Sequence, residues 1–579
     1  MQANKNSKKP GELEMIISDS VKTTDALTDV MSQFNIRRIF ETFNSVKRSG
    51  VVVSKVLTIL LMMPFYNVAS IRALFKSGLS GIEGQKDVYY DIKNNEKINW
   101  RTLLYLIVKR FIYLIEHRTE LQKPGIKAFI FDDSPVEKTS KKTEGVSVIH
   151  DHVTGRFILG YKILVCGYWD GGSFIPIDFS LHREKGRELE KVLHALRKAE
   201  QALNDAGEKL KMVAIKKNVK TEKLREWQKI ADKSASKTNQ YYFKRAEKSQ
   251  LKAEYELKQA KKELTKKKKQ LTNTQRQAKE TEYRHPSYGL SKKEKKGQCH
   301  KRRERSTSGY GRIKESDTDK IENMLNMLRR AVKRGIKADF VLTDSWFFCY
   351  ELLYTLHHLA KGQIKLISMA KMGIQKYTLL KNERDYNAKA LLKIFERKAQ
   401  YCKKLKSHYI KIPCLYKGIR VNLFFVRMGR GANWKLLVTT DLNLNFIQLI
   451  DIYKIRWSIE VFFKEGKQYL NLGQSLSQNF DAQIADTTLS MIQYIMLCYY
   501  KRINYQQSIG YLFKEISSQM IEKNISERLW NFFIELQVII GDMAGFDVLE
   551  IYQELFKRKE TAEIIERIFI STYEKDKAA

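Results

Sequence analysis

Apolar residues recur at helical spacing through the first fifth of the chain, from about residue 24 to residue 116. Residues 51–63 predict one helix that Pro64 ends, and Asn99 is placed to cap a later one. The Lys and Arg residues scattered among these short helices would suit a small DNA-binding domain, such as a helix-turn-helix variant. A purely structural helical cap explains the same pattern equally well.

The hydrophobic period changes at Gly125. Residues 126–134 form a short apolar run that ends in Asp132 and Asp133, which predicts a buried strand. Residues 156–182 then predict two strands, rich in Ile, Val, Tyr and Phe, around an Asp170-Gly171-Gly172 turn. We therefore expect a three-stranded antiparallel unit whose first strand carries both aspartates to its end.

The second half alternates between helical and strand patterns. A helix from about Asp317 leads into residues 338–346, a short apolar strand that ends at Asp344. Residues 400–442 predict β-hairpins, with a turn at Lys417-Gly418. A long helix follows at residues 451–470, and further helices occupy the remainder. This alternation indicates an α/β core.

Residues 186–313 differ sharply in composition from their flanks. Residues 191–310 contain 35 Lys plus Arg and 14 Asp plus Glu. Their net charge of +21 is about half of the whole-chain charge of +40. High helix propensity predicts a long basic helix or helical hairpin. Such a stretch inside a folded protein would follow a phosphate backbone, although lysine runs are commonly just solvated.

The overall composition narrows the class of protein. A formal charge of +40 points to a polyanionic partner, of which nucleic acid is the commonest. The six cysteines form no CxxC pair, which fits a reducing compartment and not a zinc ribbon or a disulfide framework. Residues 1–14 do not resemble a signal peptide, and residues 51–66 are too short and interrupted to span a bilayer. We expect a soluble, intracellular protein.

One helix face carries the strongest candidate chemistry. Tyr453, Arg456, Glu460 and Lys467 stand at i, i+3, i+7 and i+14, within an arc of roughly 60°. A carboxylate held between two cations and a phenol suits a divalent metal beside a phosphodiester, with Glu460 as ligand and the other three on phosphate oxygens. A solvated face with weak ion pairs would have the same spacing.

Two strand-end aspartates add to this helix face. Three carboxylates, from Asp133 or its neighbour Asp132, Asp344 and Glu460, would hold two Mg²⁺ ions about 3.5–4 Å apart. Aspartates at strand ends also form turns and cap helices, so either could be structural.

The spacing Tyr-x2-Arg-x3-Glu-x6-Lys at residues 453–467 resembles the signature of DDE transposases of the IS-four family of insertion sequences. The FDDS and LTDSW segments resemble that family's two catalytic-aspartate motifs. The resemblance covers about residues 125–185 and 320–500. It implies a ribonuclease-H-like core with the β segment between Asp344 and Glu460 inserted into it.

The resemblance also implies roles for individual residues. Asp133, Asp344 and Glu460 would bind the catalytic metal, Mg²⁺ or Mn²⁺ as its substitute, and Tyr453, Arg456 and Lys467 would contact DNA. Asp133 is preferred to Asp132 because the family's aspartate commonly precedes Thr or Ser, as it precedes Ser134 here.

The implied activity is cut-and-paste transposition of a bacterial insertion sequence, with a DNA hairpin intermediate. Its partners would be the terminal inverted repeats, the target DNA and a second copy of the chain in a synaptic dimer, in the cytoplasm or on the nucleoid. Trp346, Trp434 and Trp457 could stack a flipped base, although we expect core packing for each.

Two other functions fit the same residues: a ribonuclease-H-like nuclease that does not join strands, and a basic architectural protein that binds nucleic acid through residues 186–313. The expected domains follow in chain order. An all-helical N-terminal domain covers residues 1–120, the two parts of the core cover 121–185 and 314–375, and the Lys-rich helical insertion between them covers 186–313. The β-rich insertion covers 376–444, the catalytic helix region 445–500 and a helical C-terminal domain 501–579.

Overall fold

The computed structural model describes residues 26–79, 82–184, 187–234, 236–284, 290, 292–381, 383–429, 432–504, 508–545, 558 and 560. The first 25 residues and most of the last 34 residues lie outside this part of the chain. Two compact units are formed. Their residues are 1–145, 160–182 and 299–579 in the first, and 146–159 and 183–298 in the second.

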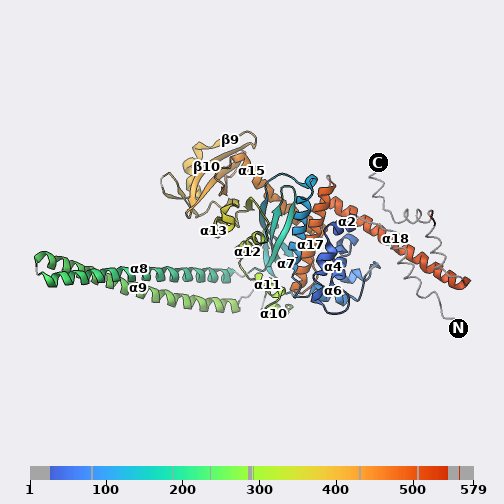
Figure 1. Cartoon of the computed structure of the whole chain (residues 1–579), viewed down its shortest axis with the longest axis horizontal. Coiled ribbons are helices and arrows are strands. Elements are labelled where there is room, and N and C mark those ends of the chain that lie inside the picture. Colours follow the sequence, from blue (N-terminus) through green and yellow to red (C-terminus); the bar gives the residue numbers. More distant parts are fainter. Residues whose placement is uncertain are drawn as a thin grey trace. The chain divides into compact units, whose positions relative to one another are not determined.

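A mixed sheet forms the centre of the first unit (Figure 1). Its five core strands are β1 (Ala128–Glu137), β3 (Arg156–Trp169), β4 (Phe174–His182), β5 (Phe340–Thr343) and β6 (Lys365–Ala370). β3 pairs antiparallel with both β1 and β4, whereas β5 pairs in parallel with both β1 and β6. The resulting order β4-β3-β1-β5-β6 is compatible with the expected ribonuclease-H-like core. The antiparallel unit of β1, β3 and β4 was correctly predicted.

The first strand is longer than its apolar run. β1 does not end at Asp132 and Asp133 but continues to Glu137, because β3 keeps pairing with it as far as Gly160. Its parallel pairing with β5 ends earlier, at Phe131 opposite Thr343. The two aspartates therefore lie just beyond the end of the pairing with β5, in a part of β1 that is still paired with β3.

The β-rich segment extends the same sheet. Its strands are β7 (Lys376–Leu379), β8 (Asp385–Asn387), β9 (Gln400–Cys402), β10 (Ser407–Tyr416), β11 (Ile419–Met428) and β12 (Lys435–Thr439), with α14 (Ala388–Phe395) between β8 and β9. The predicted turn at Lys417-Gly418 joins β10 to β11, and both residues have positive φ, as a type I′ turn requires. β12 pairs antiparallel with β6, which links this segment to the core strands.

Helices cover the core strands. The N-terminal ones are α2 (Ala26–Gln33), α3 (Ile36–Glu41), α4 (Val53–Met62), α5 (Ile71–Leu74), α6 (Lys86–Lys93) and α7 (Trp100–Glu116). The Asn99 side chain accepts a hydrogen bond from the Thr102 N–H at 3.0 Å, so the predicted cap of α7 is confirmed. α7 packs on β4 and on α17 (Phe480–Ile503), which is buried on nearly all sides and is therefore a core helix.

The remaining helices of this unit follow the second half of the chain. They are α11 (Ser308–Glu315), α12 (Lys320–Lys333), α13 (Tyr350–His358), α15 (Phe446–Lys454), α16 (Ser458–Tyr469) and α18 (Ile509–Ala544). No helix in the described ranges is long and apolar enough to cross a membrane.

A buried charge cluster fixes several helices to β4. Asp178 is 1% exposed, and its carboxylate lies 2.8 Å from Arg101 Nε of α7 and 2.9 Å from Arg330 Nη2 of α12. Arg312 of α11 lies 3.9 Å away. Burial alone would raise the pKa of Asp178, but the three guanidinium groups outweigh it and lower the pKa to about 2.

The second unit is dominated by an antiparallel helical hairpin of α8 (Arg187–Lys233) and α9 (Lys237–Arg284), as the composition predicted (Figure 1). Strand β2 (Ser147–Asp151), which pairs with β3, and helix α10 (Lys292–Lys296) complete its regular structure. Small buried residues lie between the two long helices, namely Ala206, Ala253, Ala260 and Ala278.

Candidate active site

Asp132 and Asp344 occupy equivalent positions on neighbouring parallel strands. The last paired residues of β1 and β5 are Phe131 and Thr343, and each aspartate comes next along its strand. Because the carboxyl ends of parallel strands meet at one edge of the paired region, the two carboxylates influence each other electrostatically. Asp344 Oδ1 also accepts a hydrogen bond from the Trp346 N–H at 2.8 Å, which fixes the turn after β5.

Asp133 has a different partner. Successive side chains of a strand point to opposite faces, so Asp132 and Asp133 cannot share one. The Asp133 carboxylate pairs with Lys320 Nζ of α12 at 2.8 Å. The same ammonium group lies 4.8 Å from the ring centroid of Trp346. Lys320 was not identified from the sequence, because it lies between the acidic motifs in an ordinary amphipathic helix.

The predicted long helix at residues 451–470 is divided by a change in hydrogen bonding. α15 ends at Lys454, a 3₁₀ turn covers Ile455–Trp457, and α16 begins at Ser458. Arg456 therefore lies in the tighter turn and Glu460 in the first turn of α16. Short 3₁₀ segments inside helices often mark functional positions.

Arg456 connects two of the candidate acids. Its Nη1 lies 3.2 Å from Asp132 Oδ2, and its Nη2 lies 2.5 Å from Glu460 Oε1. The Arg456 side chain is 14% exposed, compared with 18% for Asp132 and 32% for Glu460. This partly buried guanidinium group contacts both the helix carboxylate and the strand carboxylate.

Asp132 and Arg456 both have shifted pKa values at this site. Burial is the main reason that the pKa of Asp132 is raised to about 7. The neighbouring Asp344 and Asp133 act in the same direction, and the Asp133 N–H and Arg456 oppose them. Burial lowers the pKa of Arg456, but its interactions with Tyr453, Glu460 and Asp132 outweigh this and leave it raised. The guanidinium group thus stays charged while Asp132 titrates near neutrality.

Tyr453 and Lys467 are held against the core strands. The Tyr453 hydroxyl donates to the Thr343 carbonyl oxygen at 3.2 Å, and burial raises the pKa of this phenol to about 12. Lys467 Nζ donates to Ser134 Oγ at 2.7 Å and to the Pro135 carbonyl oxygen at 2.8 Å. Tyr453 therefore reaches the residue before Asp344, and Lys467 reaches the two residues after Asp133.

Three carboxylates, from Asp132, Asp344 and Glu460, could contribute oxygen ligands to a divalent cation. Carboxylate oxygens are the ligands that Mg²⁺ and Mn²⁺ prefer, and a buried acid with a raised pKa fits a site that a cation would complete. Within the described residues, however, no three His, Cys, Asp or Glu side chains converge closely enough to hold a metal. Arg456 instead lies between Asp132 and Glu460.

A comparison with known protein families identifies part of this arrangement. Residues 313–496 match the family described as the transposase DDE domain. This range includes Asp344 and the whole helix face from Tyr453 to Lys467, whereas β1 with Asp132 precedes it. No curated protein matches the chain. The DDE domain supports a transposase role, implies DNA as substrate, and belongs to a class that generally uses divalent metal ions.

The tryptophans are more exposed than expected. Trp346 is 45% exposed and Trp457 is 61% exposed, so the expectation of core packing was wrong for both. Trp434 donates from Nε1 to Glu396 Oε1 at 3.1 Å. Because Trp346 follows Asp344 and Trp457 follows Arg456, the two exposed rings adjoin the candidate site in the sequence.

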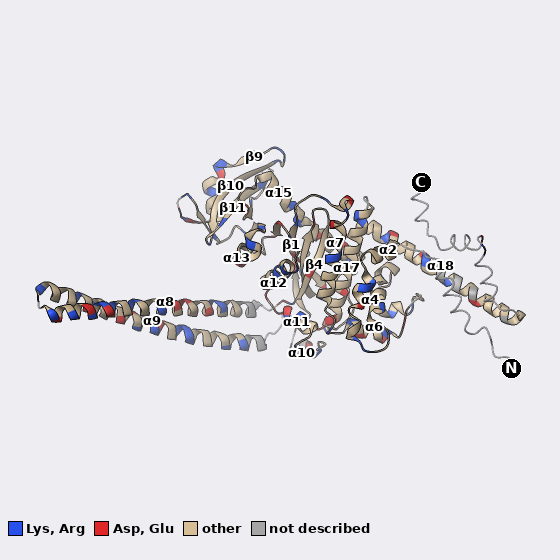
Figure 2. Ribbon diagram, viewed as in Figure 1, with Lys and Arg blue, Asp and Glu red and all other residues tan. Residues whose placement is uncertain are grey.

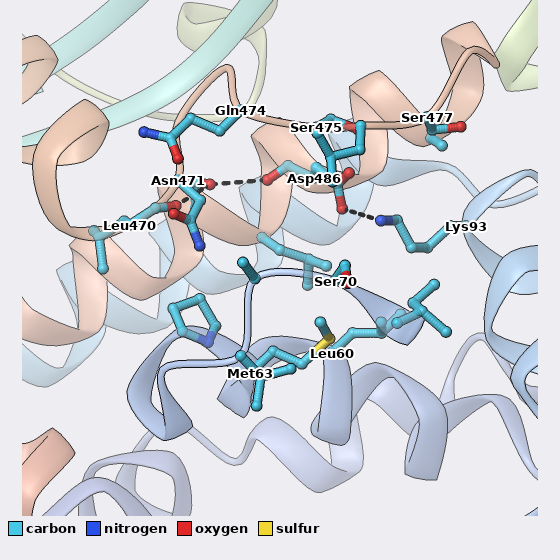
Figure 3. Close-up of a pocket in the computed structure, with 18 of the residues that line it drawn as sticks. Leu60, Met63, Ser70, Lys93, Leu470, Asn471, Gln474, Ser475, Ser477 and Asp486 are labelled. Carbon is cyan, nitrogen blue, oxygen red and sulfur yellow. Dashed lines mark hydrogen bonds and ion pairs between the residues drawn. The ribbon is translucent and has the colours of Figure 1, made fainter. Parts of the chain in front are cut away.

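A cavity of about 330 Å³ lies elsewhere in the first unit (Figure 3). It is lined by residues of α4, α5 and α6 and by the segment after α16, including Leu470, Asn471 and Ser475. An ion pair between Lys93 and Asp486, at 2.6 Å, crosses its wall (Figure 3). Asp132, Asp344 and Glu460 do not line this cavity, so it is separate from the candidate active site.

Proposed function

We propose that this chain is a DNA transposase whose active site is built on Asp132, Asp344 and Glu460. The observation that carries the proposal is the equivalent placement of Asp132 and Asp344 beside β1 and β5, with Glu460 joined to Asp132 through Arg456. The transposase DDE match at residues 313–496 supports the transposase role and includes Asp344 and Glu460, but not Asp132.

This proposal replaces Asp133 with Asp132 as the first acid. The preference for Asp133 rested on the residue that follows it, whereas the pairing with β5 aligns Asp132 with Asp344. Asp133 is neutralised by Lys320 and lies on the opposite face of β1. We assign Asp133 to holding α12 against β1.

The helix residues would act on the DNA backbone. A divalent ion, Mg²⁺ or Mn²⁺, bound to the three carboxylates would activate the attacking hydroxyl and stabilise the leaving oxygen. Arg456 would release Asp132 and Glu460 to such an ion and turn its guanidinium group to a phosphate, which it can grip with two hydrogen bonds. Tyr453 and Lys467 would contact neighbouring phosphates while remaining attached to β5 and β1.

The reaction proposed is cut-and-paste transposition. Water attacks a phosphodiester at the element's end, and the freed 3′-hydroxyl attacks the opposite strand to give a hairpin. The hairpin is reopened, and the 3′-hydroxyl then joins target DNA. Two copies of the chain would hold two inverted-repeat ends together, in the cytoplasm of a bacterial host.

The test uses a plasmid that carries this gene between its native flanking sequences. Purified full-length protein, wild type or Glu460→Gln, is incubated with the plasmid and a target plasmid, with and without Mg²⁺. We expect metal-dependent release and joining of the element by the wild type, and binding without cleavage by the variant. Cleavage by Glu460→Gln would refute the assignment of Glu460.

The products also separate the other two functions. Strand cleavage without joined DNA would indicate a nuclease. Binding without cleavage by the wild type, unaffected by metal, would indicate an architectural nucleic-acid-binding protein. Short inverted repeats at the ends of the flanking DNA would favour transposition before any protein is made.

A further inference from the structure

Helix α9 carries a row of exposed lysines in the second unit. Lys258, Lys262, Lys266 and Lys269 are all exposed, and they recur at intervals of four, four and three residues. At 3.6 residues per turn they project within an arc of about 80° and extend over about 16 Å. In the ribbon of Figure 2, Lys and Arg positions are coloured blue along this helix. We call these four residues the α9 lysine face.

The α9 lysine face points away from α8. Ala253 and Ala260 are buried at 5% and 4% exposure, and they mark the side of α9 that packs on α8. Lys262 follows Ala260 by two residues, which turns it about 200° around the helix axis from that side. The four ammonium groups therefore face outward from the hairpin.

Acidic residues of α9 near the lysine face are already paired with α8. Glu263 lies 2.8 Å from Lys209, and Glu263 is the sole acid between Lys258 and Lys269 in the sequence. Glu254 pairs with Lys217 at 3.5 Å. These acids hold the two helices together, so they leave the charge of the outer lysines uncompensated.

The excess charge is unequal between the two helices. α9 carries 15 Lys and Arg against six Asp and Glu, whereas α8 carries 13 against eight. Four like charges placed along one face repel one another and are stabilised by a polyanion. A duplex presents one negative charge per about 1.7 Å of axis, which supplies several phosphates over the length of the lysine face.

We propose that the α9 lysine face is a docking surface for the phosphate backbone of duplex DNA. The choice of DNA as the polyanion rests on the proposed transposase function. The contact gives affinity and no sequence selection, because ammonium groups contact phosphates and not base edges. The second unit would thus hold duplex DNA, whereas Asp132, Asp344 and Glu460 belong to the first unit.

The test compares two full-length variants that lose the same charge from the same hairpin. One replaces Lys258, Lys262, Lys266 and Lys269 with Gln. The matched control replaces four exposed lysines of α8 with Gln, namely Lys198, Lys211, Lys223 and Lys229. Circular dichroism checks that both retain wild-type helix content. Kd for a 40-base-pair duplex is then measured between 50 and 300 mM NaCl.

We expect the slope of log Kd against log salt to fall by about three to four for the α9 variant, since each phosphate contact contributes about 0.9. The slope of the α8 control should change by less than about one. Equal changes in the two variants, or an unchanged slope in the α9 variant, would overturn the proposal. A loss confined to duplex RNA, with DNA binding intact, would overturn it as well.

Cleavage assays separate this proposal from the proposed function. At low salt and saturating protein, the α9 variant should cleave and join DNA at a rate close to that of the wild type. Glu460→Gln should bind with the wild-type salt slope and fail to cleave. In one further outcome, the wild type fails to cleave while the α9 variant still shows the reduced slope of log Kd against log salt. That result would support the docking surface and contradict the proposed transposase function.

Discussion

Lys320 Nζ lies 2.8 Å from Asp133 Oδ2 and neutralises the acid that the sequence pattern had favoured as catalytic. Its neighbour Asp132 instead shares Arg456 with Glu460. We therefore expect Asp132→Asn to reduce DNA cleavage by at least about 100-fold, because a carboxylate proposed to bind the divalent ion is lost. Asp133→Asn should leave cleavage within about tenfold of wild type, since it breaks a partly buried pair away from that site.

Both variants should bind the element's ends with nearly wild-type affinity, which a filter-binding assay can check in the absence of metal. The reverse order of cleavage defects, with Asp133→Asn inactive and Asp132→Asn active, would return the catalytic role to Asp133.

The raised pKa of Asp132 makes both activity and stability depend on pH. The carboxyl group has a pKa of about 7 in the folded chain against 3.8 ordinarily, so folding favours its protonated form. Between about pH 4 and pH 7 the folded state binds more protons, and the stability contribution of Asp132 falls as pH rises through this window. Cleavage should rise over the same interval, because the ionised form is the one that binds a cation.

Asp132→Asn removes this titration. We expect the variant to be more stable than the wild type at pH 8, by about 1–4 kcal/mol, and no more stable at pH 4. Urea unfolding at the two pH values measures the difference. An equal effect of the substitution at both pH values would show that the acid is not perturbed.

Lys467 connects α16 to β1, and its removal should affect folding as well as DNA binding. Lys467→Met deletes hydrogen bonds to Ser134 Oγ and the Pro135 carbonyl oxygen, at a cost of about 1–3 kcal/mol in the free energy of unfolding. Lys464→Met, an exposed lysine on the same helix, should cost less than about 0.5 kcal/mol.

The same pair of variants tests the proposed phosphate contact. Lys467→Met should lower the salt slope of DNA binding by about one, as expected for one phosphate. A loss of stability with no change in slope would assign Lys467 a purely structural role.

Substitution of Asp178 should lower the stability of the first unit more than most other core substitutions. Asp178→Asn leaves Arg101, Arg312 and Arg330 without their shared counter-charge, which should cost about 3–5 kcal/mol. Because its pKa is lowered to about 2, its contribution is present above about pH 4 and is lost as pH falls toward 2. Thermal unfolding measures both effects, with Glu41→Gln in the exposed Arg37–Glu41 pair as the control, expected to cost less than about 0.5 kcal/mol.

Much of the site could be predicted because its parts have local signals. The spacing of Tyr453, Arg456 and Glu460 follows the helical period, and Asp344 ends a short apolar strand that the structure reproduces. The helical hairpin at residues 187–284 follows from composition, and the cap at Asn99 from a single residue type.

Other features depend on contacts between distant residues and have no local signal. Asp132 and Asp133 have the same sequence context, and only the pairing of β1 with β5 distinguishes their faces. The pairing of β12 with β6 likewise joins residues far apart in the sequence. The end of β1 was misplaced because apolar residues stop at Phe131, whereas backbone pairing with β3 does not.

Arg456 gives this chain an internal counter-ion. Two acids that would otherwise repel each other during folding find their compensating charge in the polypeptide itself, within 3.2 Å of one and 2.5 Å of the other. The folded chain therefore needs no bound cation to balance these two carboxylates. For the transposase proposed above, a divalent ion would then be needed for cleavage but not for reaching the folded state.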